Sequence, residues 1–245
     1  MTEKIQILLN SKRANKYINN NTSDCVFFLP NINIKKYKNI KIAVNTAQLP
    51  YSFYNVNSTN DKLVYNVNSG PTQTIYLTHQ NYNVNTLKTE LLLHLGNDFS
   101  ITYSNSKNKF TFSHSTYDFE FEAFSNCFEL LGFDDETDNS SSSRILESAN
   151  SVNLFTIRNI YITSDNFILN NINSYTPKQS NILCSIPISS MMNSIISYSN
   201  VFNIDSEINH VTNLSHLHIK LTDQDGDLIE LNKCHWSMTL ILYIN

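Results

Sequence analysis

The chain has 245 residues, which is long enough for one large domain or for a domain with an insertion, and it can bury a sizeable core. Charged residues make up only 16% of it, so much of the surface polarity must come from Asn, Ser and Thr. The formal net charge of −4 argues against a general nucleic-acid-binding protein, for which a basic domain is expected.

The charges are unevenly distributed along the chain. The simpler interpretation is two solvated surfaces, and the alternative is a basic arm that contacts a neighbouring subunit or packaged nucleic acid. The basic segment contains Lys4, Lys12, Arg13, Lys16, Lys35, Lys36, Lys38 and Lys41. The acidic segment contains Asp118, Glu120, Glu122, Glu129, Asp134, Asp135, Glu136 and Asp138.

Residues 1–21 are predicted to be an N-terminal arm, since a short apolar run at 5–9 is followed by polar sequence. This run is too short for a signal peptide, and no run reaches the ~18 apolar residues of a membrane span. We therefore expect a chain that folds in a reducing cytoplasm. The cysteines form no C-x-x-C pair, and each is predicted to be a small buried side chain rather than a disulfide partner or metal ligand. They are Cys25, Cys127, Cys184 and Cys234.

Short apolar runs that end at Pro, Gly or Asn predict the first strands. They lie at Asp24–Leu29, where Pro30 is expected to stop the strand, and at Ile40–Ala47, Leu63–Val67 and Thr74–Leu77.

The segment 79–138 has a different spacing of apolar residues. Val84, Leu87, Leu91 and Leu95 recur at helical spacing, with Asn83 or Asn85 as a cap and Gly96 as a stop. Three strands follow near 99–103, 110–112 and 119–121, and then a second helix with Phe124, Phe128 and Leu131 on one face, ended by Gly132. Helix, three strands and helix predict a small α+β unit that buries its helices on its own sheet.

Strand patterns resume after a polar loop at 134–143. They are found at Leu154–Ile157, Ile160–Thr163, Ile182–Ile188 and Ser194–Phe202.

The segment from Leu214 to Ile244 is interpreted as strand, turn and strand, with the reversal at Asp225-Gly226. Cys234, Trp236, Met238, Leu240, Leu242 and Ile244 alternate onto one face of the last strand. An apolar face of this length needs a second sheet to cover it.

The chain is therefore predicted to be mainly β. We expect an arm at 1–21, a β-sandwich of about eight strands formed by 22–78 and 139–245, and an inserted α+β unit at 79–138.

Several segments together resemble the minor capsid, or penton, proteins of virophages, Polinton-like viruses and related double-stranded DNA viruses. Two positions depart from the family pattern, with Gln80 before Asn81 where Gly is usual and Lys233 ahead of Cys234. The resembling segments are ILLNSKRA (7–14), LPYSFYNVNSTN (49–60), Asn81-Tyr82-Asn83, Leu131-Gly132-Phe133, and Asp225–Leu228 with His235-Trp236-Ser237.

The resemblance implies a single jelly-roll β-sandwich and a structural function. It implies a penton subunit at the vertex of an icosahedral virion, assembled as a homopentamer beside a double jelly-roll major capsid protein. The host cytoplasm is then the expected place of assembly, and packaged DNA is a further expected partner of the basic arm. The alternative is a β-sandwich on the virion surface that binds a receptor or a glycan, with 79–138 as the exposed head.

No catalytic, cofactor or metal site is predicted, and the chain is not expected to be an enzyme. Asp223, Asp225 and Asp227 suggest a calcium loop, but the twelfth position lacks the required Glu, so a turn is favoured. His216 and His218 have a spacing that metals use, without an evident third ligand. Glu120 and Glu122 are predicted to share one face of a strand, and a solvent-exposed face explains the pair more simply than acid-base catalysis does. The sequence contains neither a nucleophile elbow nor a Gly-rich phosphate loop.

Overall fold

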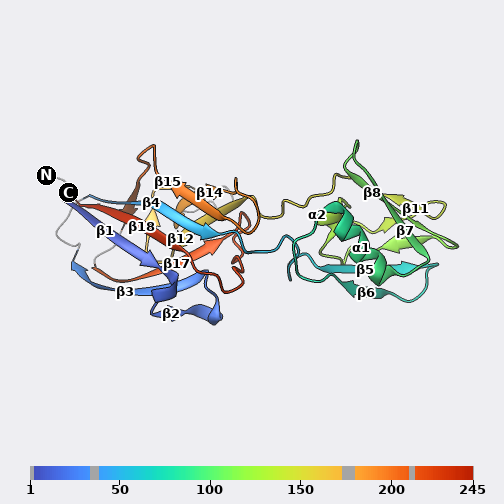
Figure 1. Cartoon of the computed structure of the whole chain (residues 1–245), viewed down its shortest axis with the longest axis horizontal. Helices are drawn as coiled ribbons and strands as arrows, with labels where there is room; N and C mark the ends of the chain where they lie inside the picture. Colours follow the sequence, from blue (N-terminus) through green and yellow to red (C-terminus); the bar gives the residue numbers. More distant parts are fainter. Residues whose placement is uncertain (1–2, 34–38, 173–179, 210–212, 245) are drawn as a thin grey trace. The chain divides into compact units, whose positions relative to one another are not determined.

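The computed structural model describes residues 3–33, 39–172, 180–209 and 213–244 (Figure 1). The chain forms two compact units, each with its own hydrophobic core. The first unit comprises Met1–Phe53 and Ile157–Asn245, and the second comprises Tyr54–Thr156.

The first unit is built from two antiparallel sheets. The first sheet consists of β1 (Glu3–Asn10), β18 (Ser237–Ile244), β4 (Ile40–Pro50), β15 (Ile195–Ser199), β16 (Ser206–Asn209) and β13 (Ile168–Leu169). The second sheet consists of β14 (Ile182–Pro187), β12 (Asn159–Ser164), β17 (Asn213–Thr222), β3 (Asp24–Asn33) and β2 (Lys16–Tyr17). Two short 3-10 turns, η1 (Ser11–Arg13) and η2 (Ile18–Asn20), flank β2.

The strand order of this unit is that of a jelly roll. β15 and β16 both pair with β4 and run in the same direction, so we count them as one interrupted strand. The eight main strands, taken in chain order, then lie as 1-8-3-6 in one sheet and 2-7-4-5 in the other. The predicted mainly β, single jelly-roll fold is therefore confirmed, and the second unit is inserted between its third and fourth strands.

The last strand closes the core as its alternation predicts. In β18 every second residue, from Met238 to Ile244, is buried, and β1 and β4 pair with its two edges. Trp236, just before β18, is 2% exposed and donates a hydrogen bond from Nε1 to the carbonyl oxygen of Thr22 at 2.7 Å. Its ring also packs edge-on against Phe27 of β3, with centroids 5.8 Å apart. This side chain therefore joins the end of the chain to the opposite sheet.

Several expectations about the first unit are wrong. Residues 3–10 of the expected arm form β1, because their apolar side chains complete the core beside β18. Pro30 does not end its strand, because β3 has an irregular register there and needs no N–H from that position. The expected strand at 154–157 is absent from the structure. The expected strand at 194–202 ends at Ser199, and Phe202 is 83% exposed.

The terminal segment is not one hairpin, since β17 and β18 lie in different sheets. The chain does reverse at Asp225-Gly226, where Gly226 has a φ of 91°. It then returns beside the end of β17, where the Ile229 N–H bonds the Leu221 carbonyl oxygen, before it crosses to the other sheet.

The second unit contains two small antiparallel sheets and two helices. One sheet contains β10 (Asn139–Ser140), β9 (Phe119–Phe121), β5 (Lys62–Val67) and β6 (Gln73–Tyr76). The other contains β11 (Ile145–Glu147), β8 (Lys109–His114) and β7 (Phe99–Ser104). The helices are α1 (Val84–Leu95) and α2 (Phe128–Leu131).

The first helix begins and ends where the sequence predicts. The Asn83 side chain accepts hydrogen bonds from the N–H groups of Asn85 and Thr86, and Gly96 ends the helix at a φ of 88°. The helix buries Leu87, Leu91 and Leu95, the apolar stripe of its amphipathic pattern. Within the described residues, no helix is both long and apolar enough to cross a membrane.

The bounds of the second unit are wider than the expected 79–138. β5 and β6 belong to it because β5 pairs with β9, and β11 belongs to it because it pairs with β8. The second helix is shorter than expected, since it starts at Phe128 and leaves Phe124 76% exposed. The inserted α+β unit is therefore larger and contains more strand than its sequence pattern indicates.

Replacing Trp236 with Ala should lower the free energy of unfolding of the first unit by about 3–5 kcal/mol, because it opens a cavity and leaves the Thr22 carbonyl oxygen without its donor. Urea unfolding followed by circular dichroism measures the loss. Phe124→Ala is the control, and its exposed ring should cost no more than about 0.5 kcal/mol. Equal effects of the two substitutions would show that Trp236 does not hold the sandwich closed.

Candidate functional site

The candidate functional surfaces of the sandwich are its two flanks, where edge strands lack a partner in the part of the chain that the structure describes. The first flank is formed by β1, η1 and β2, because among the described residues β1 pairs with β18 alone and β2 with β3 alone. The second flank is formed by β14, β15 and the loop 200–205, because in the described ranges β14 pairs with β12 alone and β15 with β4 alone. Figure 1 shows β14 and β15 along one side of the sandwich and β2 and β3 along the other.

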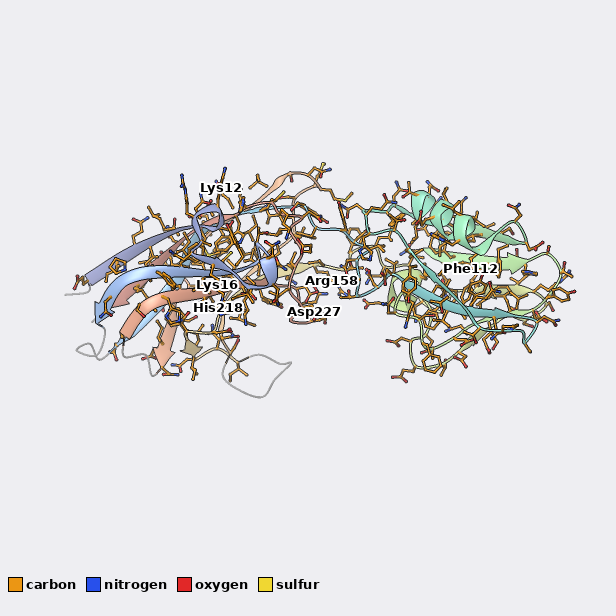
Figure 2. The ribbon with its side chains drawn as sticks, turned by 90° about the horizontal axis from the view of Figure 1, so that it is seen from below. Lys12, Lys16, Phe112, Arg158, His218 and Asp227 are labelled. Carbon is orange, nitrogen blue, oxygen red and sulfur yellow. The ribbon has the colours of Figure 1, made fainter. Side chains whose placement is uncertain are left out.

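The first flank is basic. Lys12, Arg13 and Lys16 are exposed, and no carboxylate pairs with them among the described residues. Figure 2 shows the side chain of Lys12 projecting outward from this unit. The flank therefore carries three cations free to meet an anionic or polar partner.

The other basic residues of the N-terminal segment are placed differently. Lys4 lies over the ring of Tyr243, with its ammonium 5.2 Å from the centroid. Lys41 forms an ion pair with Asp205 at 2.9 Å, and this pair raises the pKa of the lysine. Lys35, Lys36 and Lys38 lie outside the described residues. The basic segment of the sequence is thus not one continuous cationic surface in the described part of the fold.

The second flank has the opposite character. From Ser180 to Ile204 the sequence contains no Asp, Glu, Lys, Arg or His. Burial raises the pKa of the Cys184 thiol and, most strongly, that of the neighbouring Tyr198 phenol, so both stay neutral at pH 7. The flank is therefore uncharged along the whole of β14 and β15.

An ion network lies on the second sheet, and sequence analysis missed it. The His218 ring on β17 contacts the Asp24 carboxylate through Nε2, and its Nδ1 lies 3.1 Å from the Asp165 carboxylate. Lys220, on the same face of β17, lies 2.6 Å from Asp165. The Asp24 side chain is only 5% exposed, so its charge needs this imidazole as a partner. The network ties β3, β17 and the turn after β12 together.

The predicted His216-x-His218 pair does not act as one unit. The His216 side chain is exposed, and its Nδ1 lies 3.4 Å from the hydroxyl oxygen of the neighbouring Ser215. His218 is instead engaged on both ring nitrogens by the network. Across the described ranges, no group of three or more His, Cys, Asp or Glu side chains is arranged to hold a metal ion.

The aspartates at 223–227 form a turn. One oxygen of the Asp223 carboxylate accepts hydrogen bonds from the N–H groups of Asp225 at 3.0 Å and Asp227 at 2.9 Å. Burial raises the pKa of Asp223, although these N–H groups act in the opposite direction. Backbone donors already occupy this oxygen, so its main role is to fix the reversal around Gly226.

The acidic residues of the second unit also have local structural partners. Asn66 of β5 donates from its Nδ2 to Glu120 of β9 and to Glu122, which follows this strand, at 3.2 Å each. Asp118 accepts hydrogen bonds from the Ser141 hydroxyl and from the Arg144 N–H. These carboxylates stabilise strand pairs and loops.

The cysteines are free thiols, and their burial differs more than expected. Burial raises the pKa of Cys25 and of Cys127 to about 12, so both remain protonated in the two cores. Cys184 is half-buried. Cys234 is exposed, because β18 starts only at Ser237, so the expectation of a buried Cys234 is wrong.

Comparison with solved structures returns matches over nearly the whole chain. One is the crystal structure of the mavirus penton protein, with 14% identity, a TM-score of 0.47 and 100% of both chains covered. Another is the Sputnik virophage, with 10% identity, a TM-score of 0.41 and coverage of 99% of this chain and 97% of that one. No protein-family model matches the chain, and no curated protein matches its sequence.

Replacing His218 with Ala should destabilise the first unit by about 2 kcal/mol, because the buried Asp24 carboxylate loses its partner. His216→Ala is the matched control on the same strand and should change stability by less than about 0.5 kcal/mol. Urea unfolding of His218→Ala, Asp24→Asn and the double variant gives the coupling energy, expected at about 1–3 kcal/mol. Strictly additive effects would contradict the pairing.

Proposed function

We propose that the chain is a capsid protein, the penton subunit at the vertices of an icosahedral virion. In this proposal it assembles as a homopentamer beside a double jelly-roll major capsid protein, in the cytoplasm of the host. The observation that carries the proposal is the complete jelly-roll strand order of the first unit, which is a recurrent architecture of viral capsid domains.

The segments that resemble penton proteins support the proposal because they occupy positions that shape the fold. Asn55 and the Asn81-Tyr82 pair belong to two different resembling segments, and they bind each other. The Tyr82 N–H donates to Asn55 Oδ1 at 2.8 Å, while Asn55 donates from Nδ2 to the Tyr82 carbonyl oxygen at 2.8 Å and from its N–H to Asn81 Oδ1 at 2.9 Å. Residues from two separate resembling segments are therefore in direct contact in the folded chain.

Two further resembling segments contain residues at positions that restrict the type of side chain. Gly132 ends α2 at a φ of 79°, and a Cβ at this position would collide with the backbone of Asn150 and Ser151. Trp236 lies in the core of the sandwich and bonds to Thr22. Both positions require the residue type that is present.

The proposed activity is assembly, and its chemistry lies at subunit contacts. A ring of identical subunits joins two different surfaces of each copy, so each subunit must present a complementary pair. The two flanks of the sandwich are open on opposite sides and differ in charge, which suits such contacts. The basic first flank also supports packaged DNA as a partner, since Lys12, Arg13 and Lys16 can pair with phosphates.

A second candidate function, receptor or glycan binding, is favoured by exposed aromatic rings on the second unit. Tyr76, Tyr117 and Phe124 are 59%, 49% and 76% exposed, and sugars stack on such rings. Binding of the full-length protein to a glycan array would support this function. Unchanged binding by a Tyr76→Ala/Tyr117→Ala/Phe124→Ala variant would exclude these rings as the platform.

The capsid function is tested by the mass of the protein and its place in particles. Light scattering should give a mass of five chains, and an electron-microscopy reconstruction of purified particles should place the chain at the five-fold vertices. A single-chain mass at high concentration, together with absence of the chain from purified particles, would exclude the proposal.

A further inference from the structure

The second flank has unusually many large apolar side chains in solvent. Val201, Phe202 and Ile204, in the loop after β15, are 70%, 83% and 63% exposed. Met191 and Ile195, at the other end of β15, are 85% and 55% exposed. The exposed apolar residues therefore lie at both ends of this edge, and we call them together the apolar ridge.

Features that protect an edge strand in a monomer are scarce here. Such edges usually carry charged side chains, most often Lys, which prevent another chain from pairing with them. The apolar ridge lies within the uncharged stretch from Ser180 to Ile204, and β15 offers an open strand edge. A groove of about 400 Å³ between β14 and β15 lies beside it, lined by Leu183, Cys184 and Tyr198 as well as by ridge residues. An exposed apolar surface of this kind indicates a protein contact.

A complementary surface exists on the same chain. A hollow of about 510 Å³ lies on the first sheet and extends across β1, β18, β4 and β15. Its lining contains no charged side chain, and at its β1 end Leu8 is 74% exposed. The hollow reaches the first flank at Leu8 and the second flank at β15, and hydroxyl and amide side chains line it together with apolar ones. One chain therefore presents both an apolar ridge and an uncharged hollow with Leu8 at its rim.

Charge disfavours one of the possible contacts between copies. Two first flanks facing each other would bring Lys12, Arg13 and Lys16 against the same residues of another copy, and like charges repel. The second flank carries no charge that would oppose these cations. A contact between different flanks is therefore free of the repulsion that a symmetric contact of two first flanks would meet.

We infer that the apolar ridge of one copy docks on the hollow beside Leu8 of the next copy. This contact is heterologous and can be repeated around a closed ring. The inference rests on the proposed capsid function, which supplies identical copies as neighbours, and it names the two surfaces through which they join.

Phe202→Asp and Leu8→Asp should each abolish the oligomer of the full-length protein, because each places a charge in an apolar contact. Light scattering should give a single-chain mass for either variant alone. Both side chains are exposed, so circular dichroism and urea unfolding should match the wild type. Phe124→Asp is the control for an added charge at an equally exposed ring, and it should keep the wild-type mass.

Mixing the two monomeric variants tests the direction of the contact. Leu8→Asp retains an intact apolar ridge, and Phe202→Asp retains an intact hollow, so one complete contact can form. The mixture should therefore give a dimer of one copy of each variant and nothing larger. No dimer in the mixture, or dimers of Leu8→Asp alone, would overturn the head-to-tail contact.

The remaining outcomes separate the inference from the proposed function. If the wild type is an oligomer and Phe202→Asp or Leu8→Asp keeps its mass, the docking surfaces are wrong while the capsid function stands. If the wild type has a single-chain mass and purified particles lack it, both proposals fail.

Discussion

The sandwich depends on one constraint, which is that the apolar face of β18 must be covered from the other sheet. Trp236 meets this constraint at the point where the chain enters its last strand. Its ring is almost completely buried, and its only polar atom bonds to the Thr22 carbonyl oxygen, just before β3 of the second sheet. A buried indole without such an acceptor would carry the free-energy cost of an unpaired donor. Residues more than two hundred positions apart are thus fixed together, and the eight strands must close around them.

This closure explains how a second unit can be inserted without disturbing the first. The chain leaves the sandwich after Phe53 and returns at Ile157. Phe53 packs in the core of the first unit and Ile157 packs against it. The inserted unit buries its own aromatic cluster, which includes Phe110, Phe112 and Phe121. Near its start, Asn55 donates hydrogen bonds from Nδ2 to the carbonyl oxygens of Tyr82 and Leu154 and so connects distant parts of the unit. Two separate cores allow one unit to serve assembly while the other varies, which is compatible with either candidate function.

Local patterns in the sequence predicted the elements better than their partners. Alternation predicted β4, β12 and β18. The end of α1 was located at Gly96 and its cap was narrowed to Asn83 or Asn85, because these signals act over a few neighbouring positions. The assignment of β17 and β18 to one hairpin failed because a turn at Gly226 says nothing about which sheet the next strand joins. The His218 network could not be predicted, since Asp24 and Asp165 come close only after three segments have been placed. The lack of charge at 180–204 is present in the sequence, but only the fold shows that this stretch lies along an open sheet edge.

The lack of charged residues on the second flank has a consequence for how this edge can associate. An open apolar edge promotes uncontrolled pairing unless its extent is limited. Here Pro187 ends β14, and the loop at 200–205 interrupts the strand formed by β15 and β16, so the free edge of β15 is only five residues long. Such a short edge offers few backbone hydrogen bonds, and most of the stabilisation of a contact must come from side chains. Side-chain packing depends on shape and so distinguishes one partner surface from another, whereas backbone pairing accepts many strands. A flank of this design favours a specific and limited contact over open-ended aggregation.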